Sequence, residues 1–423
     1  MDSAISSNTQ TAILVVAVAV LFGWLYLKLK PSKPNLPPGS FGLPIIGELI
    51  GWVRALESGT AYKWIEERVA RHCPIFKTSF MGNRTVVVTG TVANKFVFTS
   101  GDEMLRSHQP VPIVYIAGEQ SIFEVHGARH KLVRRAIAGF LRPESLQRSV
   151  PLMSSLIKRY LTKGAWVLPI YLPFTPYYRA LAARRRIYDR FSAIVDERWR
   201  RLEYGSLSPN DDVITAMLSM KDEEGRMVPR PEILDNLITL VMASHDTGVS
   251  LNASFIRHLA MDEVTLKHIC DEHTKILSET KDGNLIWSDV QKMKYTWRVA
   301  QELLRIDSPS IGNFRTAVRD ISFNGYTIPK GWQTAFPEPE KFNPTRFEGA
   351  SKSFQPYTFV PFGGGPRVCS GSDYACVSLS LIVHHLVMNY RWSMLVPDEL
   401  VVRNPFAYPA MDLPIKVYKK EEA

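Results

Sequence analysis

The residues with the clearest potential for chemistry lie in the segment FGGGPRVCSG, residues 362–371. Cys369 stands near the end of this glycine-rich segment, and an apolar run that is typical of a helix follows at residues 377–388. Backbone N–H groups of the loop, with the positive end of the next helix dipole, would stabilise a thiolate at Cys369. Arg367 is always charged, and its guanidinium binds carboxylates with two parallel hydrogen bonds. The segment therefore predicts a thiolate beside a carboxylate-binding cation.

The glycines of this segment favour close approach to a large, flat group. Gly363, Gly364 and Gly365 have no Cβ, so the backbone can pass where a side chain would clash. A thiolate, a cation and such a surface fit axial ligation of a haem iron with its propionate neutralised. Two other interpretations remain, a glycine-rich turn around a buried structural cysteine and a phosphate-binding loop. The Gly-Lys-Ser/Thr that a Walker loop needs is absent.

The remaining cysteines and the net charge argue against two other classes of protein. Cys73, Cys270 and Cys376 show no CxxC spacing and no nearby paired histidines, so a zinc site is not expected. The formal net charge is +10, but the basic residues are scattered and form no basic run interleaved with aromatics. Attraction to anionic lipid or to an acidic redox partner explains this charge equally well, and we expect no nucleic-acid partner.

The N-terminus predicts a membrane anchor followed by a hinge. Residues 11–27 (TAILVVAVAVLFGWLYL) are uncharged and mostly apolar, at the short end of what spans a bilayer. A cleaved signal peptide is the rival interpretation, but residues 1–10 contain no lysine or arginine. Lysines follow the run instead, which places residues 1–10 in the lumen and the bulk of the chain in the cytoplasm. The basic, proline-rich residues 28–44 predict a semi-rigid hinge before a domain at 45–423.

Two stretches in the middle of the chain carry polar groups that suit catalysis. His130 and Arg134 lie four residues apart in a helical pattern, so both would project from one face and could grip an anion. A solvated basic face is the more common explanation. Residues 231–261 form a long helical pattern whose first half is apolar nearly all round, which indicates a buried helix. Asp246 and Thr247 interrupt it and indicate a kink or a proton path, with a capped helix end as the alternative.

Two further motifs precede the cysteine segment. Glu302 and Arg305 lie three apart on a predicted helix, a pair that by itself would mean little for stability. Arg346 lies in the segment FNPTRF at residues 342–347. In chain order the sequence thus shows HxxxR, AxxDT, ExxR, FxPxRF and FxxGxRxCxG.

In this order and spacing, these motifs resemble those of the cytochrome P-450 monooxygenases, and the likeness runs along the whole chain. Within that family the chain looks most like the plant terpenoid oxidases, which include triterpenoid (β-amyrin-type) 28-oxidases and taxane hydroxylases. The narrower likeness is carried by the stretches KMKYTWRVAQELLR, GNFRTAVRDISFNGYTIPKGWQ and FPEPEKFNPTRFEG.

The resemblance implies a mainly α fold with a smaller β region (α+β), the haem-thiolate monooxygenase fold, behind a single N-terminal transmembrane helix. Two alternating stretches, residues 76–89 and 320–329, have glycine-asparagine pairs at their centres and predict β-hairpins within that β region. Most other segments between residues 60 and 390 carry helical patterns or irregular chain.

The resemblance also implies a role for each motif residue around a haem b. Cys369 would be the proximal thiolate ligand of the iron. Asp246 and Thr247 would deliver the protons for dioxygen activation on the distal side. Contacts with the haem propionates would come from His130, Arg134, Arg315 and Arg367, and further cofactor contacts from Phe362 and Gly371. A buried charge network of Glu302, Arg305 and Arg346 would hold the proximal side in shape.

The implied reaction inserts one oxygen atom into an unactivated C–H bond of a hydrophobic terpenoid or sterol-like substrate. Because the chain shows no flavin or nicotinamide motif, electrons would come from NADPH through a separate membrane-bound reductase at the endoplasmic reticulum. Basic residues of the proximal face would meet this acidic partner. Substrate contacts are implied, by analogy with the family's layout, for Ile113, Tyr115, Ile116, Met242, Ile311 and Phe314.

The chain departs from the family pattern in length and in single positions. It is expected to be internally shortened near residue 161, where helices beside the central helix would be lost, and near residue 333, where a strand and a turn would be lost. Ser370 stands where the family has proline or alanine. Two other classes of function therefore stay open: a non-catalytic or poorly folded homologue that keeps the haem motifs, and a membrane-anchored lipid-binding protein without redox chemistry.

Overall fold

The structure is a computed structural model. It describes residues 35–43, 46–80, 83–140, 175–209, 211–279, 285, 287–310, 312–335, 357–403 and 406–420. The predicted anchor at 11–27, the preceding residues 1–10 and residues 28–34 and 44 of the predicted hinge lie outside these ranges. Within them, no helix combines the length and apolar character that a membrane span requires.

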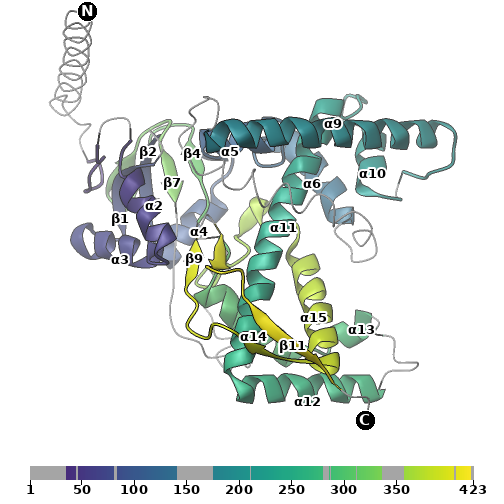
Figure 1. The fold of residues 1–423 in the computed structure, drawn as a ribbon. Helices are drawn as coiled ribbons and strands as arrows, with labels where there is room; N and C mark the ends of the chain where they lie inside the picture. The colour runs from purple at the N-terminus through teal and green to yellow at the C-terminus, as the bar shows by residue number, and fades with distance from the viewer. Residues whose placement is uncertain are drawn as a thin grey trace, which may run out of the picture.

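The described part of the chain is mainly helical, as the sequence predicts. Its helices are α2 (Leu49–Glu57), α3 (Ala61–His72), α4 (Thr91–Thr99), α5 (Val111–Ala117), α6 (Gly127–Phe140), α9 (Pro176–Glu203), α10 (Val213–Ser219), α11 (Arg230–Met261), α12 (Glu263–Glu279), α13 (Trp287–Val290), α14 (Lys294–Ile306), the 3₁₀ turn η4 (Gly365–Arg367) and α15 (Ser372–Asn389). The long helix α11 runs through the middle of the molecule, with α9 across its first half and α12, α14 and α15 around its second half (Figure 1).

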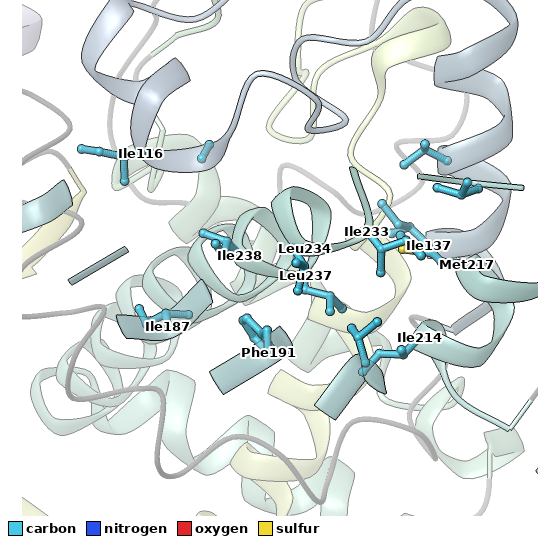
Figure 2. Packing of buried hydrophobic residues seen from close by; sticks show 14 of the residues in the cluster. Ile116, Ile137, Ile187, Phe191, Ile214, Met217, Ile233, Leu234, Leu237 and Ile238 are labelled. Carbon is cyan, nitrogen blue, oxygen red and sulfur yellow. The ribbon is translucent and has the colours of Figure 1, made fainter. Parts of the chain in front are cut away.

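Helix α11 forms because its first half is apolar on almost every face. Ile233, Leu234 and Ile238 are at most 1% exposed, and each such buried side chain stabilises the fold by about 1.5–3 kcal/mol. They pack against side chains of α5, α6, α9 and α10 in one cluster (Figure 2). Helix α9 begins at Pro176, where the Thr175 hydroxyl accepts the Tyr178 N–H at 3.2 Å. This cluster fixes the upper half of α11 against the segment that leads into α6.

The second half of α11 packs against α14, which carries Glu302 and Arg305, and against α15, which follows the cysteine segment. Leu251 and Phe255 of α11 join buried residues of α14 and α15 in a second cluster. Phe362, from the segment before α15, packs on its edge. One continuous helix thus links the first cluster to the elements that flank the cysteine segment.

The β region consists of short strands in one larger sheet and three two-stranded sheets. The larger sheet has the order β1 (Ile75–Phe80), β2 (Asn83–Val88), β7 (Gln333–Ala335), β4 (Arg315–Ala317) and β3 (Leu105–Ser107). The small sheets pair β5 (Ile321–Phe323) with β6 (Tyr326–Ile328), β8 (Tyr390–Met394) with β11 (Ile415–Lys419), and β9 (Val401–Arg403) with β10 (Ala407–Pro409).

Both predicted hairpins are confirmed. In the first, β1 and β2 pair antiparallel with Phe80 opposite Asn83. In the second, β5 and β6 pair with Phe323 opposite Tyr326. The connecting Asn324 and Gly325 have φ of 51° and 81°, which is the left-handed geometry that an Asn-Gly hairpin turn requires.

The chain near residue 333, where a strand was expected to be lost, still forms a strand. β7 pairs parallel with β2 through Thr334 and Val86, and antiparallel with β4 through Gln333 and Thr316. It therefore lies between the N-terminal hairpin and the strand that carries Arg315. The chain that follows it, and the expected junction near residue 161, lie outside the described residues.

A buried histidine pair between α12 and α15 makes the fold sensitive to acid. His273 Nδ1 lies 2.9 Å from His384 Nδ1, and its Nε2 lies 2.8 Å from the Thr296 hydroxyl. Burial and the neighbouring His384 lower the pKa of His273 to about 4. Between pH 6.5 and 4 the unfolded chain therefore binds a proton that the folded chain excludes, and stability falls as the pH falls through this window.

We expect this pair to cost up to roughly 3 kcal/mol of unfolding free energy between pH 7 and pH 4. Thermal unfolding of the wild type and of His273→Gln, measured across that pH range, tests it. The variant should show a shallower fall in melting temperature. His268→Gln, on the exposed face of the same helix, is the matched control and should keep the wild-type slope. Equal slopes for all three proteins would contradict the expectation.

Candidate haem-binding site

The Cys369 sulfur lies at the N-terminal end of helix α15. The N–H of Gly371, the residue that caps α15, donates to Cys369 Sγ at 3.4 Å. The Cys369 N–H donates to the Phe362 carbonyl at 2.8 Å, which closes the loop on itself. The first turn of α15 directs its positive end toward the sulfur, as the sequence predicts, and this favours the thiolate.

One side of Cys369 is exposed at the protein surface, and protein atoms surround the rest of the residue. This desolvation raises the pKa of the thiol, while the Gly371 N–H and the charge of Arg134 act in the opposite direction. The raised pKa means that the free thiol keeps its proton near neutral pH. Binding of a metal cation would supply the remaining free energy that removes it.

Among protein neighbours, the glycines of the loop make their closest approach to helix α4. A Cβ on Gly365, whose φ is +65°, would lie 2.0 Å from the Phe98 carbonyl oxygen. A Cβ on Gly364 would lie 3.0 Å from the Phe98 ring, and one on Gly363 would lie 3.8 Å from it. Gly365, against the Phe98 backbone, and Gly364, against its ring, are therefore required by the close approach of α4, whereas Gly363 makes only ordinary contact. They seat the cysteine loop on α4.

Arg134 and Arg367 join the cysteine loop to helix α6 and to the loop before it. Arg134 on α6 donates from Nη1 to the Val368 carbonyl at 2.5 Å and to Ser370 Oγ at 2.9 Å. Ser370, which departs from the family pattern, thus accepts a hydrogen bond that proline or alanine could not. Arg367 donates to the carbonyls of Ile122 and Val125 at 3.1 and 2.8 Å.

The basic residues expected to meet propionates form a partly buried cluster of like charge. Arg315 is 6% exposed, and burial together with the charge of Arg367 lowers its pKa to about 10. Burial is the main cause that lowers the pKa of Arg367, and the charge of Arg134 lowers it as well. Asp102, whose carboxylate lies 3.4 Å from Arg367, offsets part of this charge. Like charges in such a cluster repel one another, and an anionic ligand would relieve the repulsion.

His130 belongs to the same cluster but is not one of its cations at neutral pH. It is 5% exposed, and burial with the charges of Arg367 and Arg134 lowers its pKa to about 4. It would therefore meet a carboxylate as a neutral hydrogen-bond donor. The two carboxylates of a haem fit this set of three guanidiniums and one neutral imidazole, which lies beside an accessible cysteine sulfur.

Asp246 and Thr247 lie in the middle of α11, and helix α11 continues through them. Asp246 is 1% exposed, and its Oδ1 accepts a hydrogen bond from the Tyr408 hydroxyl at 3.1 Å and lies 3.0 Å from His245 Nδ1. Burial and the Asp246 carboxylate raise the pKa of Tyr408. The Thr247 hydroxyl donates to the Ala243 carbonyl at 2.6 Å. The alternative of a capped helix end is wrong, because the helix ends only at Met261.

Tyr408 is the site residue that sequence reasoning misses. It comes from β10, 162 positions after Asp246. A lone tyrosine in a short strand carries no motif, so nothing in the sequence pairs it with an aspartate in a distant helix.

The predicted ion pair on α14 is formed as two parallel hydrogen bonds. Arg305 Nε and Nη2 donate to the two carboxylate oxygens of Glu302 at 2.8 and 2.7 Å. Glu302 is fully buried, and the Arg305 side chain is 18% exposed. The third member of the predicted network, Arg346, lies outside the described residues.

Three of the six expected substrate contacts share one cluster. Ile113 and Ile116 lie in the buried cluster around the first half of α11, and Met242 packs on its edge. Ile116 is fully buried. Phe314 packs against a different cluster, below the N-terminal hairpin. Tyr115 is 49% exposed, and Ile311 lies outside the described residues.

Comparison with known proteins gives the family. Residues 154–410 match the family model described as Cytochrome P-450. The chain is 31% identical to a taxane 13-alpha-hydroxylase of Taxus cuspidata, over 99% of this chain and all of that protein. It is 33% identical to a beta-amyrin 28-monooxygenase of Medicago truncatula, over 96% of this chain and 97% of that protein.

A solved structure agrees with these relatives. The retinoic acid-bound structure of a cyanobacterial protein of this family superposes with a TM-score of 0.79 at 25% identity, over 92% of this chain and all of that one. The predicted resemblance and the mainly helical fold are thereby confirmed. With its cysteine loop, its guanidinium cluster and its relatives along nearly the whole chain, the protein belongs to the cytochrome P-450 family of monooxygenases.

Proposed function

We propose that this chain is a haem-thiolate monooxygenase that oxidises an unactivated C–H bond of a hydrophobic terpenoid or sterol-like substrate. The observation that carries the proposal is the site itself, in which Cys369 Sγ receives the Gly371 N–H beside a guanidinium cluster with excess positive charge. The substrate class is supported by the relatives, which are named for the oxidation of β-amyrin and of taxanes.

In this proposal each residue acts through the contact that it makes. A bound haem b would supply dioxygen activation, with one oxygen atom entering the substrate and the other leaving as water. Cys369 would ligate the iron, and the Gly371 N–H would limit the charge on its sulfur. Arg315, Arg367 and Arg134 would hold the propionates with charge-assisted hydrogen bonds.

Proton supply would come from the middle of α11. Asp246 Oδ1 is held by the Tyr408 hydroxyl and His245, so the carboxylate has a fixed orientation in a buried place. Thr247 Oγ1 already donates to the Ala243 carbonyl and keeps its lone pairs available to accept. We propose that protons pass from Asp246 to Thr247 and on toward the distal side of the haem.

Asp246→Asn is expected to lower product formation about 100-fold, because a positioned proton donor contributes roughly 10²–10⁴-fold. Product formed per haem and its solvent isotope effect are measured in microsomes. Haem content should stay at the wild-type level. Asn252→Ala, six positions further along the same helix, is the control and should stay within about twofold, since its amide bonds only the Gly248 carbonyl in the described residues. Wild-type turnover by Asp246→Asn would contradict the assigned role.

The electrons are proposed to come from NADPH through a membrane-bound reductase, with both proteins at the endoplasmic reticulum membrane. The uncharged residues 11–27 would anchor the chain, residues 1–10 would lie in the lumen, and the net charge of +10 favours an acidic partner and anionic lipid. The relatives are named as a hydroxylase and a monooxygenase, which supports an oxygenase that needs an electron donor.

We also propose that this chain is shorter than its relatives because it lacks segments near residues 161 and 333. The alignment with the taxane 13-alpha-hydroxylase spans 484 residues, whereas this chain has 423, so at least 61 aligned positions have no counterpart here. The cysteine loop, the guanidinium cluster and the buried Glu302–Arg305 pair are nevertheless formed. These contacts favour an active enzyme over a homologue that has lost haem binding.

The substrate test is a feeding experiment. Microsomes that contain this chain and a reductase are supplied with NADPH and either a β-amyrin-type triterpene or a taxane-type diterpene. We expect one class to gain oxygen, detected as a mass increase that depends on NADPH. Microsomes that contain the Cys369→Ser variant and the reductase are the matched control. Haem-loaded enzyme that turns over neither class would contradict the substrate assignment while leaving the monooxygenase assignment in place.

A further inference from the structure

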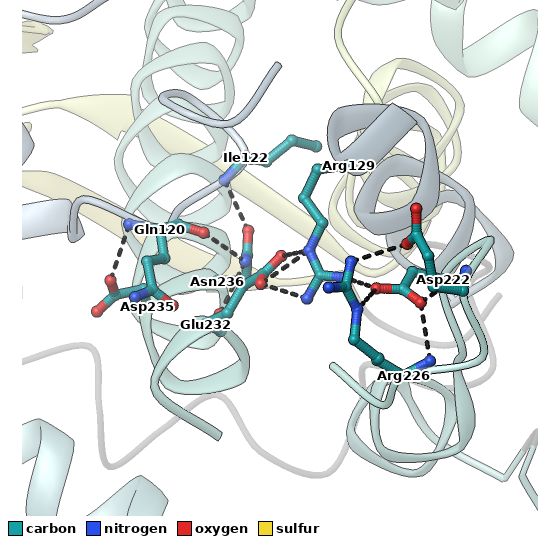
Figure 3. A network of polar contacts seen from close by, with 9 residues as sticks. Gln120, Ile122, Arg129, Asp222, Arg226, Glu232, Asp235 and Asn236 are labelled. Atoms are coloured by element: carbon teal, nitrogen blue, oxygen red, sulfur yellow. Dashed lines mark hydrogen bonds and ion pairs between the residues drawn. The ribbon is translucent and has the colours of Figure 1, made fainter. Parts of the chain in front are cut away.

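The loop between α5 and α6, residues 118–126, is fixed by the carboxamide of Asn236 on α11. Asn236 is fully buried, and its Oδ1 accepts the Ile122 N–H at 2.7 Å. Its Nδ2 donates to the Gln120 carbonyl at 3.1 Å and to the Glu232 carbonyl at 2.8 Å (Figure 3). One side chain near the start of α11 thus satisfies two backbone groups of a loop more than 100 positions away.

The same loop also binds Arg367 of the cysteine segment. Arg367 Nη1 donates to the Ile122 carbonyl at 3.1 Å, and Nη2 donates to the Val125 carbonyl at 2.8 Å. Ile122 therefore gives its N–H to Asn236 and receives Arg367 at its carbonyl. The backbone of one residue joins the central helix to the arginine of the haem loop.

The neighbours of Asn236 hold the loop in the same place. Asp235 Oδ2 accepts the Gln120 N–H at 3.1 Å, and the Asp235 carboxylate also pairs with Arg184. A Cβ on Gly118, whose φ is +110°, would lie 2.3 Å from Asp235 Oδ1, so the loop begins in tight contact with α11. The loop cannot shift toward α11 to compensate for the loss of Asn236, because this space is filled.

We infer that Asn236 is a positioning residue for Arg367 and, through it, for the haem propionate that Arg367 binds. The inference rests on the proposed function, since it needs a haem at Cys369. Removing the Asn236 carboxamide takes away the side-chain partner of the Ile122 N–H and of the Gln120 carbonyl, in a partly buried place. The loop then relaxes, and the two carbonyls that orient the Arg367 guanidinium move with it. The guanidinium loses its fixed orientation while its charge remains.

The test compares haem retention, a readout separate from turnover. Wild-type protein, Asn236→Ala and Thr239→Val are loaded with haem, and the rate of haem transfer to excess apomyoglobin is measured. Thr239 is the matched control because it is equally buried on α11 and its hydroxyl donates to the Ala117 carbonyl at 3.2 Å, outside the Ile122 connection. Asn236→Ser keeps a hydroxyl at the position and gives a second variant if the alanine variant does not fold.

We expect Asn236→Ala to lose haem about 10-fold faster than Thr239→Val, which is the lower end of the roughly 10- to 100-fold that loss of an outer-shell contact costs. In an Arg367→Lys background, which removes the forked contacts to Ile122 and Val125, the added Asn236→Ala change should accelerate haem loss less than about twofold, because coupled residues are not additive. The carbon monoxide spectrum of the reduced protein is recorded for each variant and should keep its thiolate band.

Two results would overturn the inference alone. One is equal haem loss from wild type and Asn236→Ala, and the other is the same acceleration by Asn236→Ala in the wild-type and Arg367→Lys backgrounds. A wild-type chain that takes up no haem would overturn the proposed function, and the inference would fall with it.

Discussion

Replacing Cys369 by serine is expected to remove the red-shifted Soret band of the reduced carbon monoxide complex and to abolish product formation. The reason is that serine oxygen cannot supply the thiolate electron density that favours O–O cleavage. The loss should exceed the roughly 10- to 100-fold that removal of an outer-shell contact costs in a metal site. Spectra and product formation per milligram of purified protein measure both effects.

Cys376→Ser is the matched control for this substitution. Cys376 lies on α15, in the helix that Cys369 precedes, and burial raises the pKa of its thiol to about 11. It lies outside the cysteine loop, seven positions after Cys369, so the proposed site gives it no role as a ligand. We expect this variant to keep the wild-type spectrum and turnover. A red-shifted band that survives in Cys369→Ser but disappears in Cys376→Ser would show that the ligand was assigned to the wrong cysteine.

Breaking the buried pair on α14 is expected to produce the largest loss of stability. Glu302→Gln leaves the Arg305 guanidinium with a neutral amide where it had a bidentate carboxylate. Removal of one partner from a buried ion pair costs about 3–5 kcal/mol, and the 18% exposure of Arg305 places this site near the lower end. Chemical unfolding of the haem-loaded protein, and the yield of folded protein on expression, measure the loss.

An exposed pair on α9 serves as the control for Glu302. Glu197 lies 3.5 Å from Arg201, and both side chains are about half exposed. Glu197→Gln should change the unfolding free energy by less than about 1 kcal/mol, because solvent screens such pairs. If both glutamine variants unfold at the same denaturant concentration, the Glu302–Arg305 pair is not the structural element that we take it to be.

The parts of the fold that the sequence predicts are those set by local pattern. The apolar face of residues 231–261 predicts α11, and the turn at Asn324-Gly325 predicts the hairpin of β5 and β6, since a turn of this type needs left-handed residues. Residues three apart share a helix face, so the spacing of Glu302 and Arg305 predicts their pairing. The cysteine loop is predictable because its thiolate, dipole and cation lie within ten residues.

The contacts between distant segments could not be predicted. Phe98 lies against Gly364 and Gly365, Tyr408 holds Asp246, and Asn236 fixes Ile122, yet none of these pairs shares a local motif. The last two depend on how α11 packs against chain more than 100 positions away. The expected substrate contacts stay a prediction: Ile113, Ile116 and Met242 share one cluster, whereas Phe314 packs against another.

The central claim, that Cys369 ligates a haem in a correctly formed site, has one direct measurement. The full chain is expressed in membranes, reduced and exposed to carbon monoxide, and the difference spectrum is recorded. The account predicts a red-shifted Soret band that is characteristic of thiolate ligation, in proportion to the haem content. A spectrum without haem, or with a carbon monoxide band typical of a haem without thiolate, would contradict it.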